Sequence, residues 1–158
     1  CSGTSSPSWR SFPSSEAGEM QLAQTVPEVT EADIARLVEA FYGRIRAHPA
    51  LGPVFRAALG DTEAAWEPHL AKLRRFWSAI MLRSGAYHGD PYSAHLRLEG
   101  LTPDMFAEWL ALFDQTCVEL FAPGLAAAFG ERAHRIARSL KLGVFREGQP
   151  EASAINGA

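Results

Sequence analysis

The stretch "EADIARLVEAFYGRIRAH", residues 31–48, decides the fold class, because its apolar residues recur at the period of an α-helix. Thr30 stands before it as a candidate N-cap, with acidic residues in the first turn. The stretch "HPALGPVF", residues 48–55, then ends the helix with two prolines and a glycine. Tyr42 lies on the apolar side of this helix. A tyrosine directed into a core needs a partner for its hydroxyl, so Tyr42 is a candidate functional residue.

The helical period continues along most of the chain. It predicts a long helix from about Glu63, a short helix over 91–98, a helix that Thr102 caps, and a last helix over about 124–142. We find no alternating strand pattern and no internal repeat, and we predict an all-α domain of four substantial helices and two short ones. The short helix lies between two glycine breaks. It has little stability of its own, so something else must hold it in place.

The two ends of the chain have a different composition from this central part. Residues 1–27 lack an apolar period and begin with a stretch rich in Ser, Pro and Gly, which predicts a disordered tail. We expect the folded domain over residues 28–145 and a flexible tail over 146–158. Met20 is a candidate start, in which case the residues before it are not native. A lipid-modified Cys1 is the alternative, which no signal segment supports.

Composition excludes several classes of function. The chain of 158 residues has a formal net charge of −3 and a pI of about 6.0, which gives no reason to expect nucleic acid or an anionic membrane as a partner. No run approaches the ~20 apolar residues of a spanning helix. Cys1 and Cys117 are the only cysteines, so a disulfide framework and a cysteine zinc site are not expected, and a cytoplasmic location fits. No hydrolase motif is present.

The histidines offer the candidate chemistry. His48, His88 and His134 are expected to face solvent. His95 lies in the short helix, and His69 lies at the margin of the apolar face of the long helix. Either one alone is more typical of a structural histidine. Together with a buried tyrosine and an inward tryptophan on two further helices, they could converge on one cavity, which a flat apolar cofactor with a metal centre would fill.

The order "FYGRI…HPALGPVF…HLAKLRRFW…YSAHLRL…FAEWLALF" resembles the truncated haemoglobins of group III. The resemblance covers residues 28–145, and the paired-glycine motifs typical of groups I and II are missing. It implies a globin-like two-over-two helical sandwich around a non-covalent haem b. It also implies dioxygen, nitric oxide or carbon monoxide as ligands.

The resemblance assigns a role to each candidate residue. His95 matches the proximal histidine that binds iron, and Tyr42 and Trp109 match distal donors to bound ligand. His69 matches the distal histidine, which gates the pocket, contacts the ligand or binds iron as a sixth ligand. Haem-facing positions of the family match Phe55, Leu73, Phe76 and Trp77. Lys72 and Arg75 are candidate partners of the haem propionates.

A pocket with two donors holds oxygen tightly, which favours ligand chemistry over simple transport. The resemblance therefore allows nitric oxide dioxygenase or peroxidase-like activity. Either would need an external reductase, because the chain has no flavin or nicotinamide fingerprint. The alternative is a haem-based sensor or a protein-interaction module that keeps the globin fold.

Overall fold

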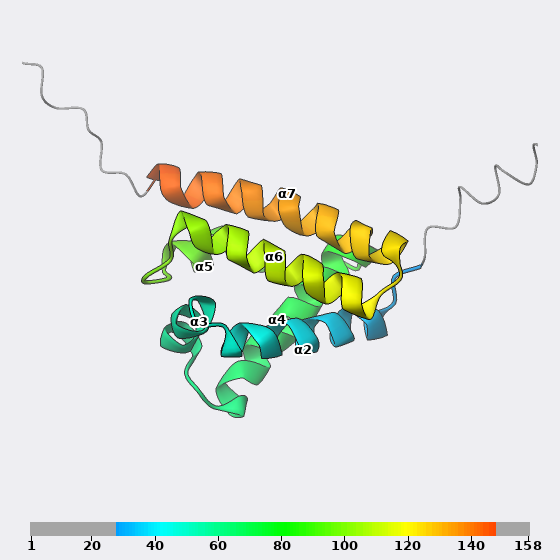
Figure 1. Cartoon of the computed structure of the whole chain (residues 1–158), viewed down its shortest axis with the longest axis horizontal. Coiled ribbons are helices and arrows are strands. Elements are labelled where there is room, and N and C mark those ends of the chain that lie inside the picture. The colour runs from blue at the N-terminus through cyan, green and yellow to red at the C-terminus, as the bar shows by residue number, and fades with distance from the viewer. Residues whose placement is uncertain (1–27, 148–158) are drawn as a thin grey trace, which may run out of the picture.

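The computed structural model describes residues 28–147, which form six helices and no strand (Figure 1). The helices are α2 (Glu31–Ala47), α3 (Leu51–Leu59), α4 (Glu63–Leu82), α5 (Pro91–Leu96), α6 (Pro103–Leu120) and α7 (Pro123–Glu147). The predicted all-α class is confirmed. The tail expected over residues 1–27 lies outside the described residues. Within the described part of the chain, no helix is both long and apolar enough to cross a membrane.

The helices form two layers, which Figure 1 shows one above the other. The upper layer is the pair α6 and α7, which lie side by side. The lower layer is α2 and α4, which cross each other. Contacts between α2 and α6 join the two layers. The short helix α3 packs against the end of α2, and α5 lies against α7.

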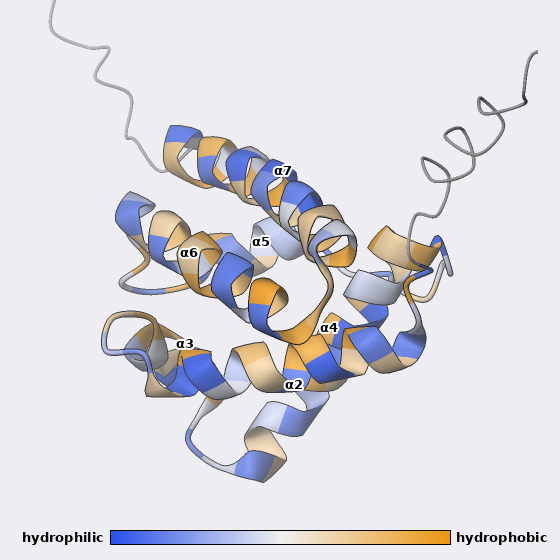
Figure 2. Cartoon of the chain, turned by 45° about the vertical axis from the view of Figure 1, so that its right-hand side comes forward, coloured by the Kyte–Doolittle hydropathy of each residue, from blue (hydrophilic) through white to orange (hydrophobic). Residues whose placement is uncertain are grey.

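The core lies between these layers, and the apolar faces of the helices turn toward it (Figure 2). Aromatic rings fill its centre. The ring of Trp77 from α4 stacks on Phe113 from α6, with centroids 5.2 Å apart, and contacts Phe129 from α7 at 5.8 Å. Trp77 therefore links three helices across the two layers.

Local sequence explains where several helices begin. Thr30 and Asp33 form a reciprocal capping box at the start of α2, as the sequence predicted for the cap. Thr62 caps α4 by accepting a hydrogen bond from the N–H of Ala65 at 3.1 Å. Gly52 lets α3 approach the end of α2, because a Cβ there would lie 2.8 Å from the carbonyl oxygen of Arg46.

Two expectations that came from the sequence need correction. The last helix does not end at Leu142 but continues to Glu147, so Arg146 lies in α7 rather than in a tail. Val144 is buried there, which stabilises the additional turn. His48 does not simply face solvent either. It is half-buried, and its Nδ1 accepts hydrogen bonds from the N–H groups of Ala50 (3.2 Å) and Leu51 (3.1 Å) at the start of α3.

Candidate functional site

Three helices bring three aromatic rings together around His69. His69 and Trp66 come from α4, Tyr42 from α2 and Phe55 from α3. The imidazole centroid lies 5.7 Å from that of Tyr42, 6.2 Å from Phe55 and 6.1 Å from Trp66. We call these four residues the His69 cluster. Three of them, Tyr42, Phe55 and His69, are candidates that the sequence placed on separate helices.

Tyr42 has a partner for its hydroxyl. The residue is buried, and the indole N–H of Trp109 from α6 donates to its oxygen. Burial raises the pKa of Tyr42 well above its usual value, more than the hydrogen bond from Trp109 lowers it, so the hydroxyl stays protonated. An indole N–H can only donate, so this bond leaves the O–H of Tyr42 available to a third group.

Phe41 supports both members of this pair. Its ring meets Tyr42 and Trp109 edge-on, with centroids 4.9 Å apart in each case. It meets Phe113 in the same way at 5.1 Å, and Phe113 stacks on Trp109 at 5.0 Å. Such edge-to-face contacts fix the orientation of rings as well as burying them. The direction of the Trp109 donor is therefore set by the core beneath it.

His69 carries an unsatisfied nitrogen. Its Nε2 is buried and has no hydrogen-bond partner, the only such side-chain atom in residues 28–147. Burial, together with the smaller effects of the charges of Lys72 and His95, lowers the pKa of His69 to about 4, so the ring is neutral at physiological pH. Leaving a buried polar atom unpaired costs about 1–3 kcal/mol. A bound group from outside the chain would satisfy this nitrogen.

His95 has one nitrogen bound and the other free. Its Nδ1 lies 2.6 Å from the carbonyl oxygen of Pro91, one turn earlier in α5. A carbonyl oxygen only accepts, so Nδ1 carries the proton and Nε2 keeps its lone pair. Asp90 caps α5 by accepting from the N–H of Ser93 at 3.2 Å, as the sequence indicated. The ring is half-buried, and His95 contributes to the lowered pKa of His69, so the two imidazoles are close enough to interact electrostatically.

An apolar cavity of about 400 Å³ adjoins His95. It lies among α5, α6 and α7, and its apolar lining consists of Leu96, Leu98, Leu101, Pro103, Val144 and Phe145. Phe106 also contacts the imidazole, with ring centroids 6.3 Å apart. The sequence did not point to this lining. The spacing from Leu140 to Val144 could have extended the last helix and would have been the signal.

The remaining candidates lie along α4. Leu73 and Phe76 are half-buried, and Phe76 meets Tyr87 of the following loop edge-on at 5.2 Å. The ring contacts of Trp77 place it in the core, so its role toward a cofactor stays a prediction. Lys72 and Arg75 are exposed. Residues 28–147 contain no group of three His, Cys, Asp or Glu side chains that could hold a metal ion by themselves.

Comparison with known proteins gives a relative that this chain covers over nearly its whole length. No family model matches the chain. The group 3 truncated haemoglobin ctb of Campylobacter jejuni is 31% identical over 120 residues, which are 76% of this chain and 94% of the relative. The chain belongs to the group III truncated haemoglobins. The crystal structure of a group III truncated haemoglobin from Campylobacter jejuni superposes with a TM-score of 0.73 at 30% identity, covering 78% of this chain and 98% of that one.

The two-layer arrangement of the helices matches the structure of this family member, so the predicted truncated-globin fold is confirmed. Membership of a haemoglobin family implies a haem cofactor and the binding of small diatomic ligands. The residues described above fit such a cofactor. The free Nε2 of His95 can bind a metal, and the Nε2 of His69 is buried without a partner.

Proposed function

We propose that this truncated haemoglobin binds haem b non-covalently through Nε2 of His95 and holds a diatomic ligand on the side of Tyr42, Trp109 and His69. The observation that carries the proposal is that two imidazole nitrogens, one on His95 and one on His69, are left without a partner. Nδ1 of His95 is committed to the Pro91 carbonyl, which leaves Nε2 free, and Nε2 of His69 is buried without a partner. Haem, when bound, supplies the iron atom to which the diatomic ligand attaches.

The hydrogen bond from Nδ1 of His95 to Pro91 has a chemical consequence. It fixes the ring orientation and the tautomer, and it makes Nε2 a better electron donor to a metal. The cap at Asp90 holds the helix that carries the ring. His95 is therefore prepared to bind iron before the cofactor arrives.

On the opposite side, Tyr42 is the direct donor to the ligand. Its O–H is free, while its oxygen already accepts from Trp109, so Trp109 acts by orienting Tyr42. A buried hydrogen bond to a partly charged acceptor such as dioxygen is worth about 1–3 kcal/mol, and each 1.4 kcal/mol is a factor of about 10 in rate. Tyr42 should therefore slow dioxygen dissociation at least several-fold. The buried Nε2 of His69 supports contact with the ligand or the metal rather than a gate that faces solvent.

We assign the remaining contacts to the haem plane and its rim. Phe55 lies within the His69 cluster and is placed to contact the macrocycle, together with Leu73 and Phe76 of α4. Trp77 supports this surface from the core. Lys72 is exposed one turn from Phe76 and is our candidate for a propionate.

Absorption spectra of the reconstituted protein test the proposal. We expect a five-coordinate ferrous form that shifts on addition of carbon monoxide. A His95→Gly variant should lose this spectrum and regain it when imidazole is added to the solution. A six-coordinate ferrous spectrum that His69→Leu converts to five-coordinate would place His69 on the metal. Failure to take up stoichiometric haem would contradict the proposal.

Dioxygen dissociation then tests the ligand side. Tyr42→Phe should accelerate it by roughly 10-fold, and Trp109→Phe by less. Carbon monoxide carries little charge, so its dissociation is the matched control. The double variant should be no faster than Tyr42→Phe alone, because Trp109 acts through Tyr42. Additive effects would instead make Trp109 an independent donor.

Slow dissociation of dioxygen supports a reaction with nitric oxide rather than delivery of oxygen. Conversion of nitric oxide and dioxygen to nitrate consumes one electron per turnover, which a partner reductase would supply. Mixing the dioxygen-loaded protein with nitric oxide in a stopped-flow instrument should give nitrate in the first turnover. Unreacted nitric oxide after mixing would remove this activity and leave ligand sensing as the function.

A further inference from the structure

The helix that carries His95 has little to hold it. α5 has six residues, none of them buried, and so short a helix is marginal by itself. Among the other helices, its main contact is with α7. The packing of α5 against α7 therefore determines the position of the His95 imidazole.

The contact centres on a glycine. A Cβ added to Gly143 of α7 would lie 2.7 Å from Cε2 and 3.2 Å from Cδ2 of Tyr92 in α5. The first distance is shorter than carbon atoms tolerate, so the ring edge of Tyr92 occupies space that any other residue at position 143 would fill. We call this site the Gly143 notch. Glycine inside a helix is less favourable than alanine, so the notch has a cost in helix stability.

Tyr92 and His95 are three residues apart in α5 and thus lie on the same side of the helix. A shift of the Tyr92 ring would therefore move or turn the imidazole with it. The His95 ring also lies 6.3 Å from the ring of Phe106, which in turn meets Phe145 of α7 at 6.0 Å. The same end of α7 thus supports His95 from two directions.

We propose that Gly143 and Tyr92 are positioning residues for His95: the ring of Tyr92 in the Gly143 notch sets the place and tilt of the imidazole relative to the iron. This inference rests on the proposed role of His95 as the iron ligand. It predicts that a side chain at position 143 displaces α5 from α7 and weakens the iron–histidine bond. Neither residue touches the ligand, so the effect must pass through His95.

The test is the iron–histidine stretching band of the ferrous, haem-loaded protein, measured by resonance Raman spectroscopy. We expect Gly143→Ala to move the band to lower frequency and to speed haem transfer to apomyoglobin by roughly fivefold or more, because the added methyl group overpacks the contact that holds α5. The matched control is Gly43→Ala, which also adds a methyl group to a helix but meets no atom within 4 Å. Gly43→Ala should leave the band and the transfer rate unchanged.

Two further variants keep the inference testable if Gly143→Ala alone does not fold. Tyr92→Leu removes the ring from the notch, and we expect the band to shift or broaden. Combining Tyr92→Leu with Gly143→Ala should bring the band closer to the wild-type position than Gly143→Ala alone, because the clash is gone. A band that is the same in wild type, Tyr92→Leu and Gly143→Ala would overturn the inference. A five-coordinate ferrous wild-type protein with no such band would instead contradict His95 as the ligand.

Discussion

Replacing Phe41 by Leu should lower the stability of the protein and speed the dissociation of dioxygen. Phe41 is almost fully buried and makes three edge-to-face contacts with centroids about 5 Å apart. The smaller side chain loses about 1 kcal/mol of apolar burial. The three ring contacts add about 0.5–1 kcal/mol each. We therefore expect the free energy of unfolding to fall by about 3 kcal/mol.

The assay for stability is urea unfolding of the haem-free protein, followed by circular dichroism, so that haem affinity does not add to the result. Phe121→Leu is the control. Phe121 is half-buried and stacks on Phe129 at 5.2 Å, so its loss should cost about 1 kcal/mol. If Phe41→Leu costs no more than Phe121→Leu, the energetic reasoning about the ring contacts is wrong.

The second readout of Phe41→Leu is ligand dissociation. Two of the contacts of Phe41 hold Tyr42 and Trp109, so dioxygen should leave the haem-loaded variant several-fold faster, while carbon monoxide should be little affected. A destabilised variant with wild-type dioxygen kinetics would show that Phe41 supports the core but does not orient the donor.

Three further predictions concern groups outside this contact. His48→Ala should cost about 1 kcal/mol of stability, because the imidazole accepts two N–H groups at the start of α3, whereas His48→Asn should retain most of it; equal losses would argue against capping. In a Cys1→Ser background, Cys117 should react with Ellman's reagent only as fast as the protein unfolds, because the thiol is buried and burial raises its pKa to about 12. Rapid labelling of the native protein would contradict this. Burial raises the pKa of Tyr42, so above pH ~10 the unfolded chain releases that proton before the native protein does, and stability should fall as pH rises. Tyr42→Phe should lose this part of the alkaline dependence in urea titrations.

Much of the fold follows from local patterns. The apolar period of residues 31–48 and the cap at Thr30 predict α2, and they place Tyr42 on the buried side of that helix. Asp90 and Pro91 likewise mark the start of α5. These features depend only on neighbours in sequence, so a pattern can reveal them.

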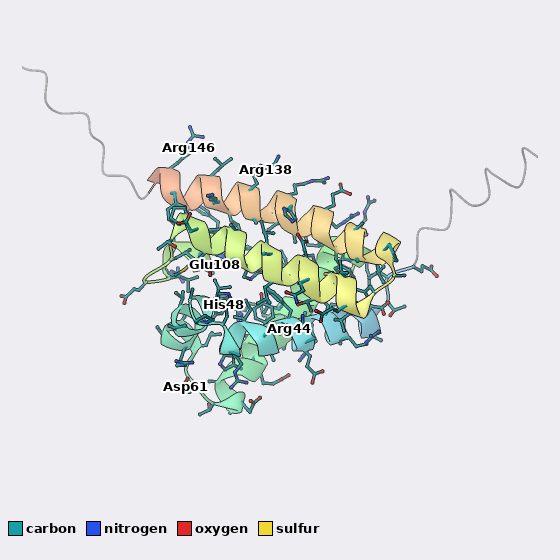
Figure 3. The ribbon with its side chains drawn as sticks, viewed as in Figure 1. Arg44, His48, Asp61, Glu108, Arg138 and Arg146 are labelled. Atoms are coloured by element: carbon teal, nitrogen blue, oxygen red, sulfur yellow. The ribbon has the colours of Figure 1, made fainter. Side chains whose placement is uncertain are left out.

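Other features depend on contacts between distant segments. The bond from Trp109 to Tyr42 joins α6 and α2, and no spacing rule predicts it; the sequence suggested one cavity for both residues, and the resemblance made them separate donors to a ligand. His48 stands beside a proline and looks like a surface residue. Its ring folds back to cap α3, and its Nε2 lies 3.6 Å from Glu108 of α6 (Figure 3).

The end of α7 was missed for a related reason. Gly143 and Arg146 resemble the end of a helix when only composition is considered. The contact of Gly143 with Tyr92 is what gives the glycine its place inside the helix, and that contact requires α5. Arg138 and Arg146 point outward from the same helix (Figure 3), whereas Gly143 contacts the ring of Tyr92.

The order of synthesis gives the contact between α5 and α7 a further meaning. A ribosome releases α5 well before the end of α7, so the helix with His95 has no support while the intervening chain is being made. The pair α6 and α7 is local in sequence and can form as soon as both helices have emerged. Only then can α5 dock. Stable capture of haem should therefore follow release of α7, and nascent chains that stop before residue 143 should retain haem poorly.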